Sequence, residues 1–411
     1  MNFLVSAKGK DITAWRAAED FAARYRQAIL NHAASDSDGT TETVYSGSLA
    51  TLGKSAETHQ TLLGQLNSIL GEGVASPPAS RLRELTIEYY DVLYRHMNEF
   101  HSVPAFYQKS MDFLKMLSTV IMARSREQLV LSAHHLPKMA LIALGPAGRC
   151  EYSPFCRLQL LLVHEEVTGS QLQSINLLCQ NLHDEFEATG LALDPVISPG
   201  NPEWRGSIAT WRQRCDDEIR LTTTDSLING LRLTDQYSLT SAEGVAQELK
   251  EIAIASLRKS RPTQANLIAR METLSNGLGM MGGLKLERSG AGRGLFNLLD
   301  HGLLPLSSAL SALALIKESS AVSSCDRIID LLKRRELDVE LAEKALETWY
   351  NLHELLLRRE QAFSIVDHTE QSLFLNPDEL TIEQHHSLKT ALTSVAAIQR
   401  HVGIVFSGMG E

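Results

Sequence analysis

The strongest constraint on this fold comes from two short apolar runs, Met139–Leu144 and Leu158–Val163, in a chain that is otherwise helical in pattern. Pro137 precedes the first run and Gly145 closes it. Apolar runs of about four to eight residues with such boundaries are typical of buried strands. A third stretch, Leu191–Ile197, has the same character. The sequence therefore predicts a small mixed sheet covered by helices.

Helical periodicity surrounds these runs. Apolar residues recur at steps of three and four in two groups of segments. Before the strands the segments are Ile12–Ile29, Leu62–Leu70, Leu82–Phe100 and a helix from about Pro104; after them they are Leu172–Phe186, Ser207–Arg214, Pro305–Ile316, Cys325–Lys333, Val339–Phe363 and Thr381–Val402. We predict a mainly helical α+β protein with an N-terminal helical region (1–100), a mixed α/β domain (101–262) and a C-terminal helical bundle (263–411).

Composition narrows the class of protein. The 411 residues include 39 Lys and Arg against 49 Asp and Glu, which gives a net charge of −10. This balance disfavours nucleic acid and anionic lipid as partners. No apolar run approaches the roughly 18 residues of a membrane span, and the N-terminus lacks a signal-peptide pattern. Five cysteines without paired spacing indicate reduced thiols. We expect a cytoplasmic protein with a protein partner, and the helical N-terminal region leaves a homodimer open.

The turn after the first strand carries a candidate anion site. It reads Gly-x-x-Gly-Arg-x-Glu, with Gly145, Gly148, Arg149 and Glu151 at the defined positions. The two glycines would let backbone N–H groups approach a phosphate, and Arg149 would add a charged donor. Because glycine-rich turns between strands are common, this motif alone does not fix a function.

A longer comparison gives the motif a context. Residues 143–163 resemble the active-site hairpin of bacterial nucleotidyltransferase-like signal-transduction proteins, which are related to PII uridylyltransferase and often fused to cyclic-nucleotide-binding and CBS modules. The segments Asn201–Trp211, Leu286–Gly290, Gly302–Pro305 and Leu375–Leu380 continue the resemblance into that family's helical substrate-binding domain. The resemblance covers roughly the last two thirds of the chain and implies a polymerase-β-like fold. We recognise no CBS or cyclic-nucleotide module upstream.

The metal-binding positions depart from the family pattern. Active members place Asp-x-Asp on the second strand, where residues two apart share a face and both carboxylates hold Mg²⁺. The matching residues here are Arg157 and Gln159, and a third acidic position falls near Arg232. The formal charge of the first pair changes from −2 to +1. At about 4 Å and an effective dielectric near 20, each charge pair is worth about 4 kcal/mol, so these residues do not suit cations.

Two interpretations of the pocket stay open at this stage. In one, Arg157 replaces the metal and contacts phosphate together with Arg149 and the glycine turn. In the other, the pocket is vestigial and Arg157 pairs with an acid such as Glu151. A metal site rebuilt from Glu151 with Glu165 or Glu166 is disfavoured, because their spacing is not that of Asp-x-Asp. In the C-terminal domain the family match runs through Arg288, which we take as a further candidate phosphate-binding residue.

The sequence thus predicts a catalytically impaired, nucleotidyltransferase-like regulator that binds a nucleotide or a protein partner in signal transduction. Its catalytic residues and metal ligands are then none, its only expected cofactor is a nucleotide, and Glu151 is the residual acid. One alternative is an active Mg-dependent enzyme that transfers a nucleoside monophosphate to a protein. A second alternative is a structural interaction protein without a ligand. The sequence leaves enzyme activity, the nucleotide, the partner and the oligomeric state open.

Overall fold

A computed structural model describes residues 41–129, 136–220, 224–240, 242–259, 261–279, 282–363, 365 and 370–408. The chain divides into two compact units, Met1–Met116 and Leu117–Glu411. The expected helix over Ile12–Ile29 lies outside the described residues. The predicted domain boundaries at residues 100 and 262 stay predictions.

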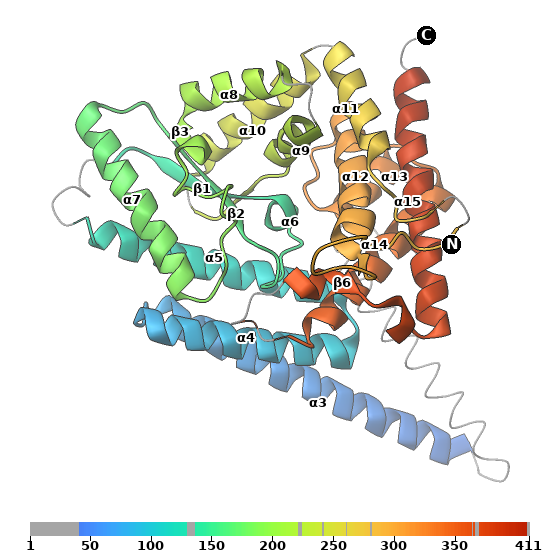
Figure 1. Ribbon diagram of the computed structural model, residues 1–411. Helices are drawn as coiled ribbons and strands as arrows, with labels where there is room; N and C mark the ends of the chain where they lie inside the picture. Colours follow the sequence, from blue (N-terminus) through green and yellow to red (C-terminus); the bar gives the residue numbers. More distant parts are fainter. Residues whose placement is uncertain are drawn as a thin grey trace. The chain divides into compact units, whose positions relative to one another are not determined.

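The first unit is helical where it is described. It contains α3 (Thr41–Val74), α4 (Ala79–Phe100) and the start of α5 (Val103–Glu127), which continues into the second unit (Figure 1). The aromatic ring of Tyr89 stacks on Phe113 with centroids 4.3 Å apart, and the hydroxyl of Tyr90 bonds Ser110 Oγ at 2.9 Å. The helices expected over Leu82–Phe100 and from Pro104 are confirmed.

A four-stranded mixed sheet lies in the described part of the second unit, in the order β3-β2-β1-β4. Its strands are β1 (Met139–Leu144), β2 (Gln159–His164), β3 (Arg205–Ser207) and β4 (Tyr237–Ser238). β1 pairs antiparallel with β2 and with β4, and β2 pairs parallel with β3. The predicted α+β class and the first two strands are confirmed. β3 and β4 have three and two residues, too few to show a periodic signal in the sequence.

The third strand expected over Leu191–Ile197 is wrong in extent. Only Leu193 bridges to Leu158, and the chain then turns at Asp194. One carboxylate oxygen of Asp194 accepts the backbone N–H groups of Val196 and Ile197, both at 2.9 Å. An aspartate that bonds its own downstream backbone favours a turn over an extended ladder, which explains why this apolar stretch does not continue as a strand.

Both faces of the sheet are covered. All six residues of β1 are buried. Alternate residues of β1 and β2 pack in one cluster with Trp211 of α8 (Ile208–Arg220) and with α10 (Glu243–Arg258), above the sheet in Figure 1. The remaining helices of this domain are α6 (Gly145–Gly148), α7 (Gly169–Ala188) and α9 (Thr224–Thr234), with a short 3₁₀ turn η2 (Pro202–Trp204). The sheet and the helices that cover it therefore form a close-packed core that holds the ends of the strands in place.

A helical bundle follows. Its helices are α11 (Arg261–Thr273), α12 (Leu304–Ile316), α13 (Ser324–Lys333), α14 (Val339–Glu360) and α15 (Ile382–Gly408). Its shorter elements are a π-helical turn η3 (Leu299–Leu303), two 3₁₀ turns η5 (Glu370–Leu373) and η6 (Pro377–Glu379), and a two-stranded antiparallel sheet of β5 (Phe296–Asn297) and β6 (Phe374–Leu375). Residues 305–316 of α12 are all buried. The four segments predicted for this bundle are confirmed to within a few residues.

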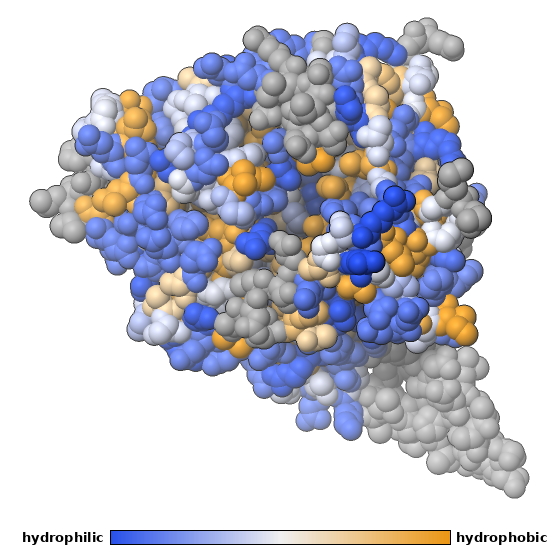
Figure 2. Space-filling model, in the orientation of Figure 1, coloured by the Kyte–Doolittle hydropathy of each residue, from blue (hydrophilic) through white to orange (hydrophobic). Residues whose placement is uncertain are grey.

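One segment among the described residues, Leu299–Ile316, is long and apolar enough to cross a membrane by composition alone. However, 78% of it is buried inside the protein, as in a core helix. On the face shown in Figure 2, hydrophobic residues form small scattered groups among hydrophilic ones. These observations place η3 and α12 at the centre of the bundle, where they form one wall of the site described next.

Candidate functional site

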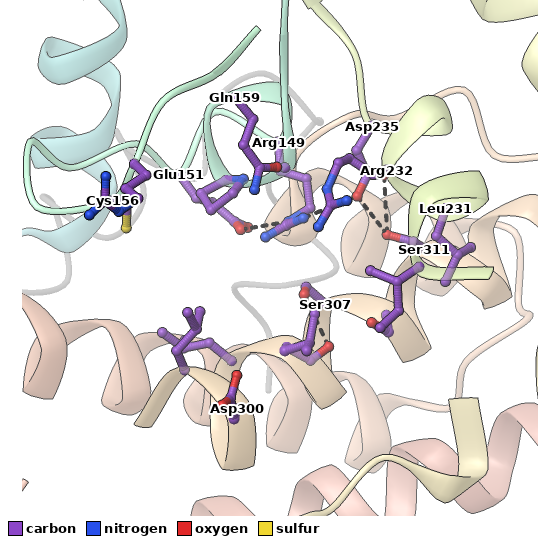
Figure 3. A pocket seen from close by; sticks show the side chains of 18 of the residues that line it. Arg149, Glu151, Cys156, Gln159, Leu231, Arg232, Asp235, Asp300, Ser307 and Ser311 are labelled. Carbon is purple, nitrogen blue, oxygen red and sulfur yellow. Dashed lines mark hydrogen bonds and ion pairs between the residues drawn. The ribbon is translucent and has the colours of Figure 1, made fainter. Parts of the chain in front are cut away.

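A cavity of about 520 Å³ lies between the four-stranded sheet and the helical bundle. Its first wall comes from the β1–β2 connection and the end of α9, and its second wall from η3, α12 and α14. Figure 3 shows Arg149, Gln159 and Arg232 on one side, with Asp300 and Ser307 opposite them. Pockets of this volume hold small organic molecules. The cavity is therefore the candidate functional site.

Arg157 and Gln159, which the sequence resemblance aligns with Asp-x-Asp, both line this cavity. Arg157 is exposed just before β2, and Gln159 is the first residue of β2, opposite Leu144 of β1. The Gln159 amide donates to Asp194 Oδ2 at 3.2 Å. At its start the strand thus presents a cation and an amide, neither of which is the carboxylate ligand that Mg²⁺ prefers.

An acid that the sequence comparison missed completes this side of the cavity. Arg232, near which the third acidic position was expected, lies in the last turn of α9, where it donates to Asn229. Asp235 lies three residues later, between α9 and the strand β4, and its side chain is 3% exposed. Because β4 has only two residues, nothing in the sequence pattern marked Asp235 as the acid beside a strand.

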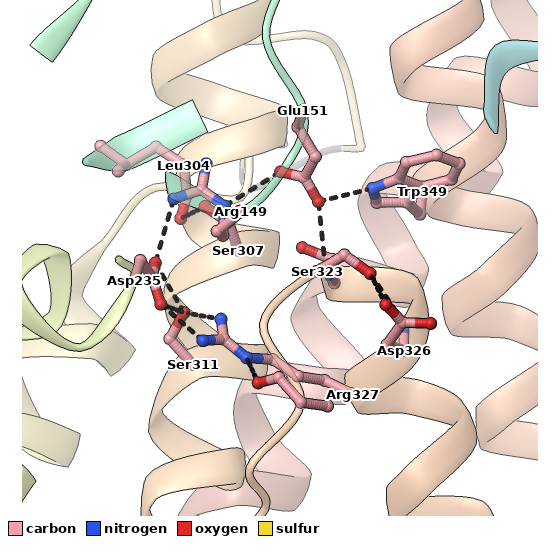
Figure 4. A network of polar contacts seen from close by, with 12 residues as sticks. Arg149, Glu151, Asp235, Leu304, Ser307, Ser311, Ser323, Asp326, Arg327 and Trp349 are labelled. Carbon is pink, nitrogen blue, oxygen red and sulfur yellow. Dashed lines mark hydrogen bonds and ion pairs between the residues drawn. The ribbon is translucent and has the colours of Figure 1, made fainter. Parts of the chain in front are cut away.

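Two arginines neutralise Asp235 (Figure 4). Arg149 Nη1 lies 3.1 Å from one carboxylate oxygen, and Arg327 Nη2 lies 2.6 Å from the other. Ser311 of α12 donates to the same carboxylate at 3.1 and 3.2 Å and accepts from Arg327 Nη1 at 2.7 Å. Both oxygens of Asp235 are therefore engaged by donors from the protein itself.

Arg149 extends the network to a second buried acid. Its Nε donates to Glu151 at 2.9 Å. The other oxygen of Glu151 accepts from Trp349 Nε1 at 3.0 Å and from the backbone N–H of Ser324 at 3.3 Å. Burial alone would raise the pKa of Glu151, but the positive charge of Arg149 and these donors hold it below its ordinary value. Glu151 is thus ionised in the folded protein, where its charge is balanced by Arg149 and its oxygens accept hydrogen bonds from the bundle.

This network joins the two parts of the second unit. Arg149, Glu151 and Asp235 come from the sheet domain, whereas Ser311, Arg327 and Trp349 come from the bundle. It contains two carboxylates and two guanidinium groups, all nearly buried, so its charges balance internally. Removing one member of such a network leaves an uncompensated buried charge, at a cost of about 3–5 kcal/mol. The network therefore holds the two walls of the cavity in a fixed register.

The two glycines of the turn have packing roles. Gly145 has a φ of +59°, and a Cβ there would meet the side chain of Gln159. A Cβ on Gly148 would collide with the backbone carbonyl of Asp235. Gly145 lines the cavity, but Gly148 is buried away from it. The close contacts that the glycines permit are with Gln159 and Asp235, which accounts for both residues without an anion.

The residues present do not fit the divalent metal pair of this chemistry. Among the described residues, no group of three or more His, Cys, Asp or Glu side chains could hold a metal ion. The carboxylate of Asp235 is already shared by two guanidinium groups, and Arg157 places another positive charge on the same wall. Hard cations require several oxygen ligands, which this wall does not supply.

Other candidate residues lie in different surroundings. Arg288 is exposed on a turn and does not line the cavity. His353 does line it, and burial lowers its pKa to about 4, so its imidazole is neutral. Cys156 also lines it, and burial raises the pKa of its thiol to about 12. A thiol with such a pKa is not an activated nucleophile.

The comparisons with known proteins agree with this two-part site. Residues 94–225 match the family model described as putative nucleotidyltransferase DUF294, and residues 261–406 match the one described as putative nucleotidyltransferase substrate binding domain. The chain carries both of these domains. Arg149 and Glu151 lie in the first match and Arg327 in the second, while Asp235 lies between them. The buried network therefore connects the two matched domains. No curated protein matches the chain.

Proposed function

We propose that this chain is a nucleotidyltransferase-like regulator that binds a nucleotide in the cavity without catalysing metal-dependent nucleotidyl transfer. The observation that carries the proposal is the neutralisation of Asp235 by Arg149 and Arg327. Together with Arg157 and Gln159 at the positions that the resemblance aligns with Asp-x-Asp, it puts positive charge where a divalent ion would have to bind.

The remaining cavity can still recognise a ligand. Guanidinium groups bind phosphate oxygens directly, through parallel N–H donors, where a metal would otherwise bridge them. Arg157 and Arg232 line the wall that the metal positions define. In this proposal they orient the phosphate. In this proposal no group is transferred, because the described lining does not supply the ligands of a metal that would withdraw charge from the phosphoryl oxygens.

The regulatory part of the proposal rests on the position of the cavity. A ligand between the sheet domain and the bundle contacts both walls, so its binding changes the free energy of their association. A protein partner that reads the relative arrangement of the two domains would then respond to the nucleotide. The alternatives are an active transferase with unusual ligands and a structural protein without a ligand.

One pair of experiments separates these classes. Calorimetric titration with ATP, GTP, UTP and their monophosphates, with EDTA or with Mg²⁺, should show binding that does not depend on the metal. Incubation with α-labelled nucleoside triphosphates, Mn²⁺ or Mg²⁺ and cell lysate should leave no label on any protein. Labelled product that disappears in the Asp235→Asn variant would establish the enzyme instead. Flat titrations with every nucleotide would establish the structural role.

A further inference from the structure

The charges around the cavity limit the kind of nucleotide that it can take. The described lining contains three arginines, Arg149, Arg157 and Arg232, against the four carboxylates of Glu151, Asp194, Asp235 and Asp300. Arg327, which pairs with Asp235 from behind this wall, brings the count to balance. A site of this kind has no excess positive charge for a ligand that carries many negative charges.

The second wall changes from apolar to polar along one helical face. Leu299, Leu303 and Leu304 line its first part, and Ser307, Ser308 and Ser311 continue the same face one and two turns further. Residues three and four apart lie above one another on a helix, so the leucines and the serines form adjacent areas of a single wall. The three serines are at least 94% buried.

This division suits an amphipathic ligand. The leucine area, with Leu356 of α14 beside it in the lining, offers apolar contact for a planar base. In the serine area, Ser307 donates to the carbonyl of Leu304 and Ser311 donates to Asp235, so their hydroxyl oxygens offer acceptor lone pairs to the hydroxyl groups of a ribose. The arginines on the opposite wall would then face the phosphate end of the ligand, as the two sides of Figure 3 indicate.

We propose that the cavity selects a nucleoside with a single phosphoryl group over the corresponding triphosphate. This inference rests on the proposed nucleotide-binding function and names its ligand class. A monophosphate, whether the 5′ ester or the 3′,5′-cyclic form, brings one or two negative charges into a wall of balanced charge. A triphosphate brings about four, and neither a metal pair nor surplus arginines compensate for them.

The test is a calorimetric series on the full chain with EDTA present: adenosine, 5′-AMP, 3′,5′-cyclic AMP and ATP, followed by the guanine and uracil series. The monophosphate of the preferred base should bind at least tenfold more tightly than its triphosphate. A triphosphate that binds as tightly or more tightly overturns the inference but leaves the proposed function standing. Absence of binding by every compound at millimolar concentration overturns the proposed function as well. The 5′ and cyclic arms identify which ester is preferred.

A variant identifies the phosphate contact. Arg232→Ala should weaken the monophosphate at least tenfold and leave adenosine unchanged, because only the phosphate loses a partner. Arg212→Ala on α8 is the matched control, since that side chain is 60% exposed and does not line the cavity. Equal losses for monophosphate and nucleoside would contradict the assignment. If Arg232→Ala lowers the melting temperature by more than a few degrees, Arg232→Gln replaces it in the same comparison.

Discussion

Arg327 Nη2 lies 2.6 Å from Asp235 Oδ1, so a residue of the helical bundle supplies the cation beside the last acid of the sheet domain. Both side chains are at most 4% exposed. Here the protein provides its own positive charge, and this charge also joins the two domains.

Arg327→Ala should therefore destabilise the protein by about 3–5 kcal/mol, because buried Asp235 would lose one of the two arginines in direct contact with it. Chemical denaturation monitored by circular dichroism measures this change. Arg334→Ala, at the residue that caps the C-terminus of α13, removes an exposed ion pair with Asp330 and should cost less than about 1 kcal/mol. Equal losses in the free energy of unfolding for the two variants would mean that the buried ion pair stabilises the protein no more than the exposed one.

A double-mutant cycle isolates the pair itself. Asp235→Asn, Arg327→Gln and the combined variant should give a coupling free energy of about 1–3 kcal/mol, since the two groups are in direct contact. Additive losses would contradict a direct interaction. Because Arg149 also contacts Asp235, the cycle with Arg149→Gln should show a second coupling.

Gly148→Ala should destabilise the sheet domain by about 2–3 kcal/mol, since its Cβ would meet the carbonyl oxygen of Asp235, a backbone atom that cannot rotate away. Gly169→Ala, at the first position of α7 with open space around it, is the control and should be neutral or slightly stabilising. Thermal unfolding of the two variants gives the comparison. A Gly148→Ala variant as stable as the control would show that the turn can shift.

His353 should contribute to acid sensitivity. Its pKa falls from an ordinary 6.5 to about 4 in the folded protein, mainly because it is buried. A depressed folded pKa gives stability that is present above pH 6.5 and lost as the pH falls toward 4. His353→Gln should therefore flatten the stability profile between these pH values by about 2–3 kcal/mol.

Urea denaturation at pH 7.5 and pH 4.5 measures this effect. His386→Gln, at an exposed position of α15, should leave the wild-type profile unchanged. Other buried histidines, such as His96 with a pKa of about 4, keep part of the acid sensitivity in the variant. A profile of His353→Gln identical to that of the wild type would contradict the assignment.

The sequence predicted the helices and strands whose apolar residues recur at a regular spacing. The amphipathic helices of the bundle and the two apolar strands appear in it as periodic patterns, and the structure has them at nearly the same residues, whereas Leu62–Leu70 is only part of the longer α3. β3 and β4 could not be found in this way, because strands of two or three residues have no period. Leu191–Ile197 misled the prediction because Asp194 bonds its own downstream backbone.

For the site, the sequence identified Arg157, Gln159 and the glycine turn, because they follow one strand in order. It could not show that Arg149 would be held by Glu151 and Asp235, since the second of these contacts joins residues 86 positions apart. Arg327 and Ser311 lie still further along the chain, and only the docking of the bundle brings them to Asp235. The cation that occupies the acidic position is therefore a property of the tertiary structure.

The most direct test of this account is Mn²⁺ binding measured by electron paramagnetic resonance. At millimolar metal, the wild-type protein should give the same Mn²⁺ spectrum as a protein-free control, with or without a nucleoside monophosphate. Stoichiometric Mn²⁺ binding that is lost in Asp235→Asn would show that this carboxylate holds a metal after all, and the account would be contradicted.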